Sequence, residues 1–204
     1  MLKNYFLPVV FSVVSLYATT SYGQDEYTET LQYHYSHAQF DSCIQLINNL
    51  LPKYKKDLPQ RIKLLNLLGK SYVRNYQYDE GQEAYTKAAE LNKGSINDLI
   101  SKDDYIASLL GVCDVYAADY RSDLMEPIIS ELKLFLSDML GSTYYGHYLF
   151  ILGKYYRPNN RPLAQKLYRQ SISYIPKWNE LSVIARLSLA NLYIWAGNDS
   201  SFFC

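Results

Sequence analysis

The sequence predicts an all-α protein built as a superhelical stack of helix pairs, an α-solenoid. Three of the four Leu-Gly dipeptides follow one another at a fixed spacing of 42 residues, beginning at positions 68, 110 and 152, while the fourth begins at position 140. A fixed period of this size is typical of arrays of helix pairs, and such arrays usually bind other proteins. Between residues 25 and 196 the apolar residues recur at spacings of three and four, and the alternation that strands require is missing.

Residues 1–23 are predicted to be a signal peptide. Lys3 gives a positive start, Tyr5–Leu16 is almost entirely apolar, and Ser21 and Gly23 are the small residues of a cleavage site. The alternative is an uncleaved anchor helix, although the apolar run is short for a membrane span. We therefore expect an exported protein, periplasmic or otherwise extracytoplasmic, with no stable membrane span after signal cleavage.

The first four helices of the mature chain are expected at residues 25–37, 40–52, 59–75 and 79–93. Asp41 and Asp79 are interpreted as N-caps, and Pro59 suits a first turn because it lacks the N–H that a helix interior requires. Gly94 is expected to end the fourth helix.

Five more helices are expected at residues 97–118, 123–140, 143–157, 161–175 and 178–196. Ser122 is interpreted as an N-cap and Gly141 as a helix end, while Pro162 suits a first turn and Pro176 a stop. The prediction is therefore four helix pairs followed by one unpaired helix.

One pair shows how such helices would pack. Its first helix carries large residues, Leu-Gly and Tyr, and its second carries small, aromatic and small residues. These positions are Leu65, Leu68, Gly69, Tyr72, Gly81, Tyr85 and Ala88. The small residues permit a close crossing of the two helices, and the tyrosine rings fill the remaining space. This pattern resembles the tetratricopeptide repeat family. A later pair matches it at Leu149, Leu152, Gly153, Tyr156, Ala164, Tyr168 and Pro176.

The resemblance extends more loosely over the whole mature chain. Its units cover about residues 24–57, 62–95, 104–141 and 146–179, with a partial unit at 183–204. It implies a right-handed superhelix whose first helices line a concave groove, and a non-enzymatic scaffold of the cell envelope that binds a protein or peptide there. It also suggests the sensing portion of a longer regulator, of which this chain would be a fragment.

Six residues are candidates for that groove. Lys63, Asn66, Lys70 and Arg74 form one stripe of the third helix, and the resemblance places Lys154 and Arg157 at corresponding positions of a later unit. Together they could clamp a terminal carboxylate or an acidic segment, with Asn66 donating to peptide backbone. The alternative is an ordinary solvated helix face.

Other classes of function find less support in the sequence. Lysines and arginines number 20 against 20 acidic residues, and this balance argues against nucleic acid as a partner. No phosphate-binding glycine loop is present, and we expect no cofactor. Two alternatives stay open: a glycan-binding protein that stacks sugars on aromatic rings, and a metal-dependent enzyme. Their candidate residues are Tyr148, Tyr155, Trp178 and Trp195 for the sugar and His34 and His37 for the metal. The oligomeric state is left open.

Overall fold

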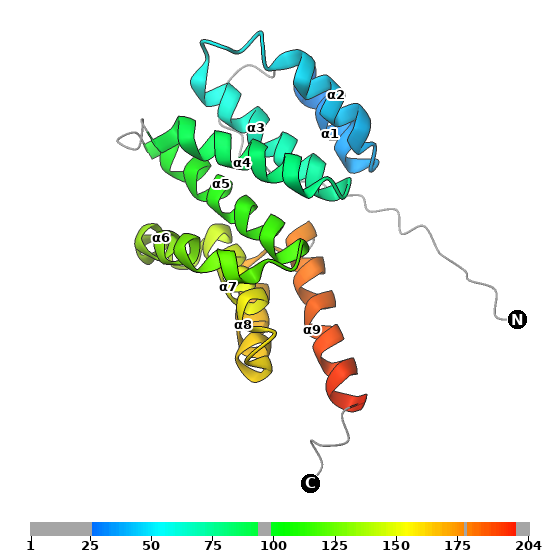
Figure 1. The fold of residues 1–204 in the computed structure, drawn as a ribbon, viewed down its shortest axis with the longest axis vertical. Helices are drawn as coiled ribbons and strands as arrows, with labels where there is room; N and C mark the ends of the chain where they lie inside the picture. The colour runs from blue at the N-terminus through cyan, green and yellow to red at the C-terminus, as the bar shows by residue number, and fades with distance from the viewer. Residues whose placement is uncertain (1–25, 94–98, 178, 199–204) are drawn as a thin grey trace, which may run out of the picture.

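A computed structural model describes residues 26–93, 99–177 and 179–198 of the protein (Figure 1). Within these ranges the chain forms nine α-helices and two short 3-10 helices, and it contains no strand. The all-α prediction is confirmed. The predicted signal peptide, Gly94 and Trp178 lie outside the described residues.

The helices follow one another with short connections. Their bounds are α1 (Glu26–Ser36), α2 (Phe40–Leu50), α3 (Leu58–Arg74), α4 (Tyr78–Lys93), α5 (Leu99–Ala118), η1 (Ser122–Met125), α6 (Glu126–Leu136), η2 (Ser137–Met139), α7 (Thr143–Tyr156), α8 (Arg161–Tyr174) and α9 (Glu180–Asn198). These bounds agree closely with the predicted ones except at 123–140. That segment is not one helix, since α6 is flanked by the two 3-10 helices.

Proline explains where α6 begins. Pro127 occupies its first turn, where the missing N–H costs no hydrogen bond, and the 3-10 helix η1 precedes it. At the other end η2 tightens the chain before Gly141, which has a φ of 90°. A helix does end near Gly141, but it is the short 3-10 helix η2, because α6 already ends at Leu136.

The helix starts show which polar residues act as caps. Asp57, Ser142 and Asn160 each accept a hydrogen bond from a backbone N–H in the first turn of α3, α7 and α8, at 3.1 Å. The cap predictions at Asp41, Asp79 and Ser122 are wrong, because these residues lie inside the first turns of α2, α4 and η1. Asp41 Oδ1 instead accepts from Asn75 Nδ2 at 2.7 Å.

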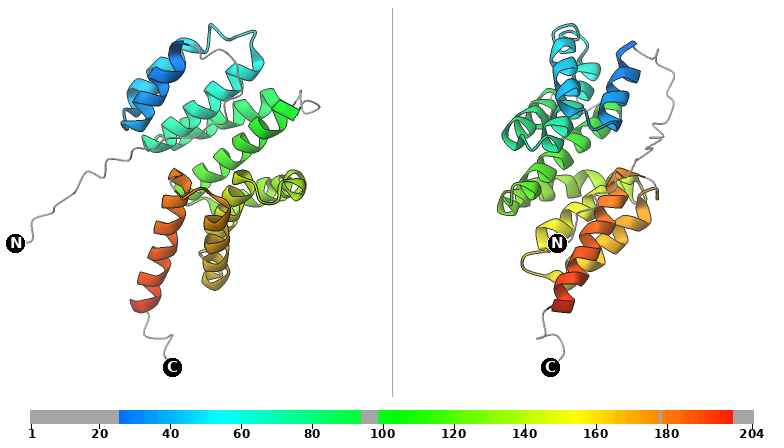
Figure 2. Two further views of the ribbon diagram at one scale, coloured as in Figure 1. Left: turned by 180° about the vertical axis from the view of Figure 1, so that it is seen from behind. Right: turned by 90° about the vertical axis from the view of Figure 1, so that its right-hand side faces the viewer.

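Consecutive helices pack against each other along the chain (Figures 1 and 2). In both figures α1–α5 form one part of the molecule, while α7, α8 and α9 run beyond it in a different direction. Three of the odd-numbered helices also meet directly, because α3 contacts α5 and α5 contacts α7. The side chains of these helices therefore share one region of the molecule.

The repeated glycines make room for tyrosine rings. Tyr85 of α4 lies between Gly69 of α3 and Gly111 of α5, and a β-carbon at either position would overlap its ring. Tyr168 of α8 lies in the same way against Gly153 of α7. The Leu-Gly period of the sequence therefore marks places where a tyrosine of a second helix approaches the backbone of a first helix.

The apolar core follows this packing in successive clusters. One cluster joins α1–α4, a second joins α5–α7, and a third joins α7–α9. Cys43 and Cys113 are fully buried and free, as expected for cysteines that act as small apolar residues. The structure therefore offers no reactive surface thiol at either position.

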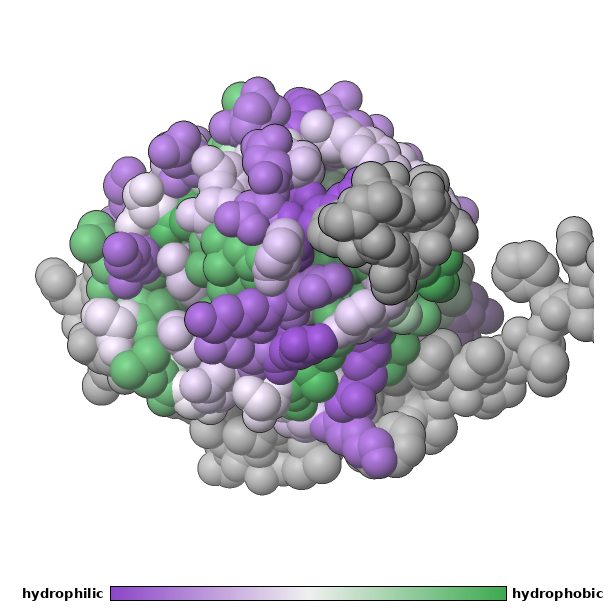
Figure 3. All heavy atoms as spheres, turned by 90° about the horizontal axis from the view of Figure 1, so that it is seen from below, coloured by the Kyte–Doolittle hydropathy of each residue, from purple (hydrophilic) through white to green (hydrophobic). Residues whose placement is uncertain are grey.

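The surface is mixed in character. The face seen in Figure 3 combines hydrophilic patches with hydrophobic ones, and its hydrophilic side chains gather across the middle. Among the helices that the structure describes, none is long and apolar enough to span a membrane.

Candidate functional site: a charge cluster on the odd-numbered helices

Polar side chains from all five odd-numbered helices form two groups of contacts that also influence each other electrostatically, and we call the two groups together the charge cluster. Its members are Tyr35 of α1, Lys70 and Arg74 of α3, Asp114 of α5, His147 and Lys154 of α7, and Glu180 of α9. Three lysines or arginines face two carboxylates in this cluster, so a positive charge is left over when His147 is neutral. The cluster therefore favours anionic groups.

One half of the cluster surrounds Glu180. Its two carboxylate oxygens are shared between two cations, with Oε2 3.0 Å from Lys70 Nζ and Oε1 2.6 Å from Arg74 Nη2. Tyr35 donates its hydroxyl to Oε2 at 3.5 Å, and Lys70 lies over the Tyr35 ring at 4.6 Å from its centroid. Three donors from α1 and α3 thus hold one carboxylate of α9.

The other half surrounds Asp114. Its Oδ2 lies 2.7 Å from His147 Nε2, and its Oδ1 lies 3.7 Å from Lys154 Nζ. Lys154 also lies over the Phe150 ring, 4.7 Å from the centroid. Asp114 therefore ties α5 to two positions of α7 that lie about two helical turns apart.

The charges shift the acidities of both carboxylates. Burial would raise the pKa of Asp114, but His147 and Lys154 outweigh it and lower that pKa to about 2. Burial would likewise raise the pKa of Glu180, yet Lys70 and Arg74 hold it below its ordinary value. Burial would lower the pKa of Arg74, but Glu180 together with smaller contributions outweighs it, and the pKa is raised. Asp114, from the other half of the cluster, makes one of these smaller contributions to the rise. The two halves therefore interact electrostatically.

Helix ends favour this arrangement. Arg74 is in the last turn of α3, where the helix dipole attracts a cation, and Glu180 is in the first turn of α9, where it attracts an anion. The pair thus joins the C-terminal end of one helix to the N-terminal end of another. Figure 1 shows the first turn of α9 beside that end of α3.

The structure divides the six predicted site residues into two groups. Lys70, Arg74 and Lys154 belong to the charge cluster, whereas Lys63 and Arg157 are exposed and outside it. The sixth, Asn66, makes hydrogen bonds within the fold.

Asn66 links α3 to α5. Its Nδ2 donates to the carbonyl of Asp104 at 3.3 Å, and its Oδ1 accepts from Ser108 Oγ at 2.8 Å. Both ends of the amide are engaged within the protein. We therefore assign Asn66 a structural role and leave it out of the proposed binding surface.

Sequence reasoning missed Tyr35, Asp114, His147 and Glu180 as members of the site. A signal existed for Asp114. It follows Leu110 by four residues, the position at which Tyr72 follows Leu68 and Tyr156 follows Leu152. A carboxylate at an aromatic position of the repeat indicates a different local environment. No comparable signal marked Glu180, whose partners are remote in sequence.

The metal alternative gains no support from the geometry of the two histidines. His34 Nδ1 lies 2.7 Å from Gln39 Oε1, and His37 Nδ1 lies 2.8 Å from the Tyr33 carbonyl oxygen, with the rings of Tyr33 and His37 stacked. Among the described residues, no three His, Cys, Asp or Glu side chains are grouped so that they could hold a metal ion.

The glycan alternative relied on exposed aromatic rings. Tyr148 is buried in the α5–α7 core, and Tyr155 packs edge-on against Tyr156. The side chains of Trp178 and Trp195 lie outside the described residues. The ring of Tyr148 therefore cannot stack on a sugar unless it leaves the core.

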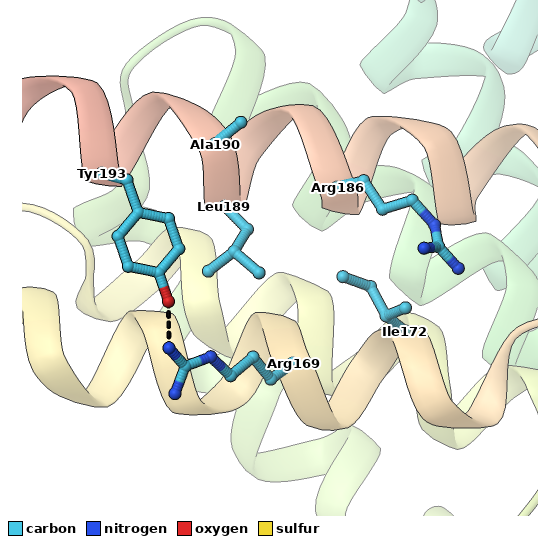
Figure 4. Close-up of a pocket in the computed structure, with 6 residues that line it drawn as sticks. All are labelled: Arg169, Ile172, Arg186, Leu189, Ala190 and Tyr193. Atoms are coloured by element: carbon cyan, nitrogen blue, oxygen red, sulfur yellow. Dashed lines mark hydrogen bonds between the residues drawn. The ribbon is translucent and has the colours of Figure 1, made fainter.

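A shallow hollow of about 400 Å³ lies between α8 and α9 (Figure 4). It is lined by Arg169, Ile172, Arg186, Leu189, Ala190 and Tyr193. Arg169 donates to the Tyr193 hydroxyl, and Arg186 Nε donates to Ser182 Oγ at 3.3 Å. The charge cluster brings together more charged side chains, from more helices, than this hollow does, and we therefore place the candidate site at the charge cluster.

Comparisons with known proteins were made for the whole chain. No protein-family model matches it, and no curated protein matches it either.

Proposed function

We propose that the protein is a non-enzymatic scaffold of the tetratricopeptide type, which binds a protein or peptide on the face formed by its odd-numbered helices. One observation carries the proposal: the members of the charge cluster all come from the first helices of the successive pairs. In the family that the sequence resembles, these helices line the concave side of a right-handed superhelix.

The packing supports the same proposal. Tyr85 and Tyr168 each pack against a glycine of a neighbouring helix. The two helices of each of these pairs therefore approach each other in a similar way. Helices held in this way form a preformed surface. Binding a ligand then costs little free energy for ordering the protein. We also propose export to the periplasm or another extracytoplasmic compartment, on the strength of the apolar run and the small residues before Gln24.

Selection from a random peptide library displayed on phage tests the proposal. Three proteins are compared: the wild type, the double variant Lys70→Ala with Arg74→Ala, and the control Lys87→Ala with Lys166→Ala. The control removes two exposed positive charges from the second helices α4 and α8. We expect peptides that bind the wild type and the control but bind the cluster variant at least about tenfold more weakly.

Circular dichroism verifies that all three proteins are helical and melt alike. Peptides that bind all three equally would place the binding surface elsewhere. A wild-type protein that selects no peptide would contradict the proposed function itself.

A further inference from the structure

The carboxylate of Glu180 occupies a site made by other helices. Each of its oxygens faces a different cation, at 3.0 Å for Lys70 and 2.6 Å for Arg74, and the Tyr35 hydroxyl adds a third donor at 3.5 Å. Charge-assisted donors of this kind recognise carboxylates in general, whichever chain supplies them. The structure therefore shows a carboxylate site that is filled by the protein's own side chain.

The packing of α9 is separate from this contact. The apolar residues that hold α9 belong to a cluster shared with α7 and α8, and its buried members are Phe150, Ala164, Tyr168, Ala185 and Leu192. The apolar cluster of α1–α4 draws its buried members from those four helices. Glu180 can therefore leave Lys70 and Arg74 while the apolar contacts of α9 with α8 persist.

The site is accessible from solvent. The side chains of Lys70, Arg74 and Glu180 are 42 %, 34 % and 32 % exposed. Ion pairs with this much solvent contact are weak, since water and salt screen them. A second carboxylate can therefore approach the cations and compete with Glu180.

We propose that Glu180 is an internal competitor, and that an acidic segment of a partner replaces it on Lys70 and Arg74. Replacement frees the first turn of α9 from α1 and α3. The recognised group is a carboxylate, from an Asp or Glu side chain or from a free C-terminus. The proposal rests on the proposed peptide-binding function and adds to it the chemistry of the ligand and the movement that accompanies binding.

Two features of the cluster favour exchange over simple loss of Glu180. The three positive side chains outnumber the two carboxylates, so an incoming anion meets an attractive field. If Glu180 left without a replacement, the positive charges of Lys70 and Arg74 would lose the carboxylate that they share. An external carboxylate restores the pairing that Glu180 gives up.

The test uses peptides that carry a neutral BODIPY label, which adds no carboxylate of its own, and the purified protein at low ionic strength. The probes are a hexaglutamate with an amidated C-terminus, a hexaglutamine with a free C-terminus, and an amidated hexaglutamine. Fluorescence anisotropy gives the Kd of each for the wild type, Glu180→Gln and Glu126→Gln. The last variant is a matched control, because Glu126 is an exposed glutamate in the first turn of α6.

We expect Glu180→Gln to bind a carboxylate peptide about tenfold more tightly than the wild type, because the internal competitor is gone. Glu126→Gln should resemble the wild type, and amidated hexaglutamine should bind none of the three proteins. Hexaglutamate and the free C-terminus distinguish the two sources of the carboxylate. Equal affinities for all three proteins, or no binding of either carboxylate peptide to Glu180→Gln, would overturn the proposal.

Hydrogen exchange of the backbone amides of α9 separates this proposal from the general function. Amides in the first two turns should exchange faster in Glu180→Gln than in the wild type or Glu126→Gln, without any peptide. Saturating hexaglutamate should produce the same increase in the wild type. If α9 exchanges identically in all these samples, Glu180 does not hold the first turn of α9 against α1 and α3. The library selection can still succeed in that case, so the proposed function would stand alone.

Discussion

The ring of Tyr85 in α4 lies so close to Gly111 of α5 that a β-carbon at position 111 would overlap it. The ring cannot move to the other side, because Gly69 of α3 is there at a similarly short distance. We expect Gly111→Ala to lower the free energy of unfolding by about 1–3 kcal/mol, the usual cost of overfilling a packed core. Urea denaturation followed by circular dichroism measures it.

The control for this prediction is a double-mutant cycle with Tyr85→Leu. Leucine lacks the ring atoms that position 111 would meet, so the overlap disappears in that background. Gly111→Ala should then be neutral or stabilising by up to about 1 kcal/mol, because alanine is the better helix former. A similar loss in both backgrounds would show that the ring is not the cause.

Much of the fold was predictable because it depends on local signals. The 3.6-residue periodicity and the prolines at 59 and 162 placed the helix ends within about two residues at most positions. The exception, residues 123–140, arises because Pro127 can begin an α-helix but cannot lie within one, so η1 precedes it. Periodicity alone does not distinguish a 3-10 turn from the start of a helix.

The site was less predictable because its contacts are remote in sequence. The stripe of Lys70 and Arg74 follows from helical spacing, but nothing near Glu180 indicates that these two cations are its partners. Asn66 belongs to the same stripe, yet its amide is used by Asp104 and Ser108 of α5. Helical spacing shows which residues lie on one face of a helix. Only the packing of the neighbouring helices decides which of these side chains stay available to bind a ligand.

Asn66 should therefore matter for stability and not for binding. We expect Asn66→Ala to lower the free energy of unfolding by about 1 kcal/mol, because it removes hydrogen bonds between α3 and α5. Asn48→Ala, at an exposed position of α2, is the control and should cost less than about 0.5 kcal/mol. If Asn66→Ala leaves stability unchanged but weakens the selected peptides, its role is in binding after all.

Processing of the N-terminus can be measured directly. When the full chain is expressed in a bacterium with general secretion, we expect cleavage after Gly23, so that the mature protein begins at Gln24. Intact-mass spectrometry of the periplasmic fraction reports this cleavage. A protein that keeps residues 1–23 and is found in the membrane fraction would instead support the anchor helix.

The stability of the fold should fall in acid because of Asp114. Its pKa is lowered to about 2 in the folded protein, whereas an unfolded aspartate has an ordinary value near 4. The folded state therefore binds the proton less readily than the unfolded state. The stabilisation is fully present above about pH 4 and is lost as the pH falls toward 2. For a side chain that is 26 % exposed, we expect a loss of about 2 kcal/mol in the free energy of unfolding.

Asp114→Asn tests the assignment, because asparagine keeps the shape but cannot titrate. The variant should be less stable than the wild type at pH 6 and should lose less further stability between pH 4 and pH 2. The lowered pKa of Glu180 adds an acid dependence of the same sign, so Asp114→Asn flattens the curve without abolishing its slope. Asp123→Asn, at an exposed position of η1, is the matched control and should follow the wild type. Parallel curves for Asp114→Asn and the wild type would contradict the prediction, since the acid sensitivity would then arise from other carboxylates.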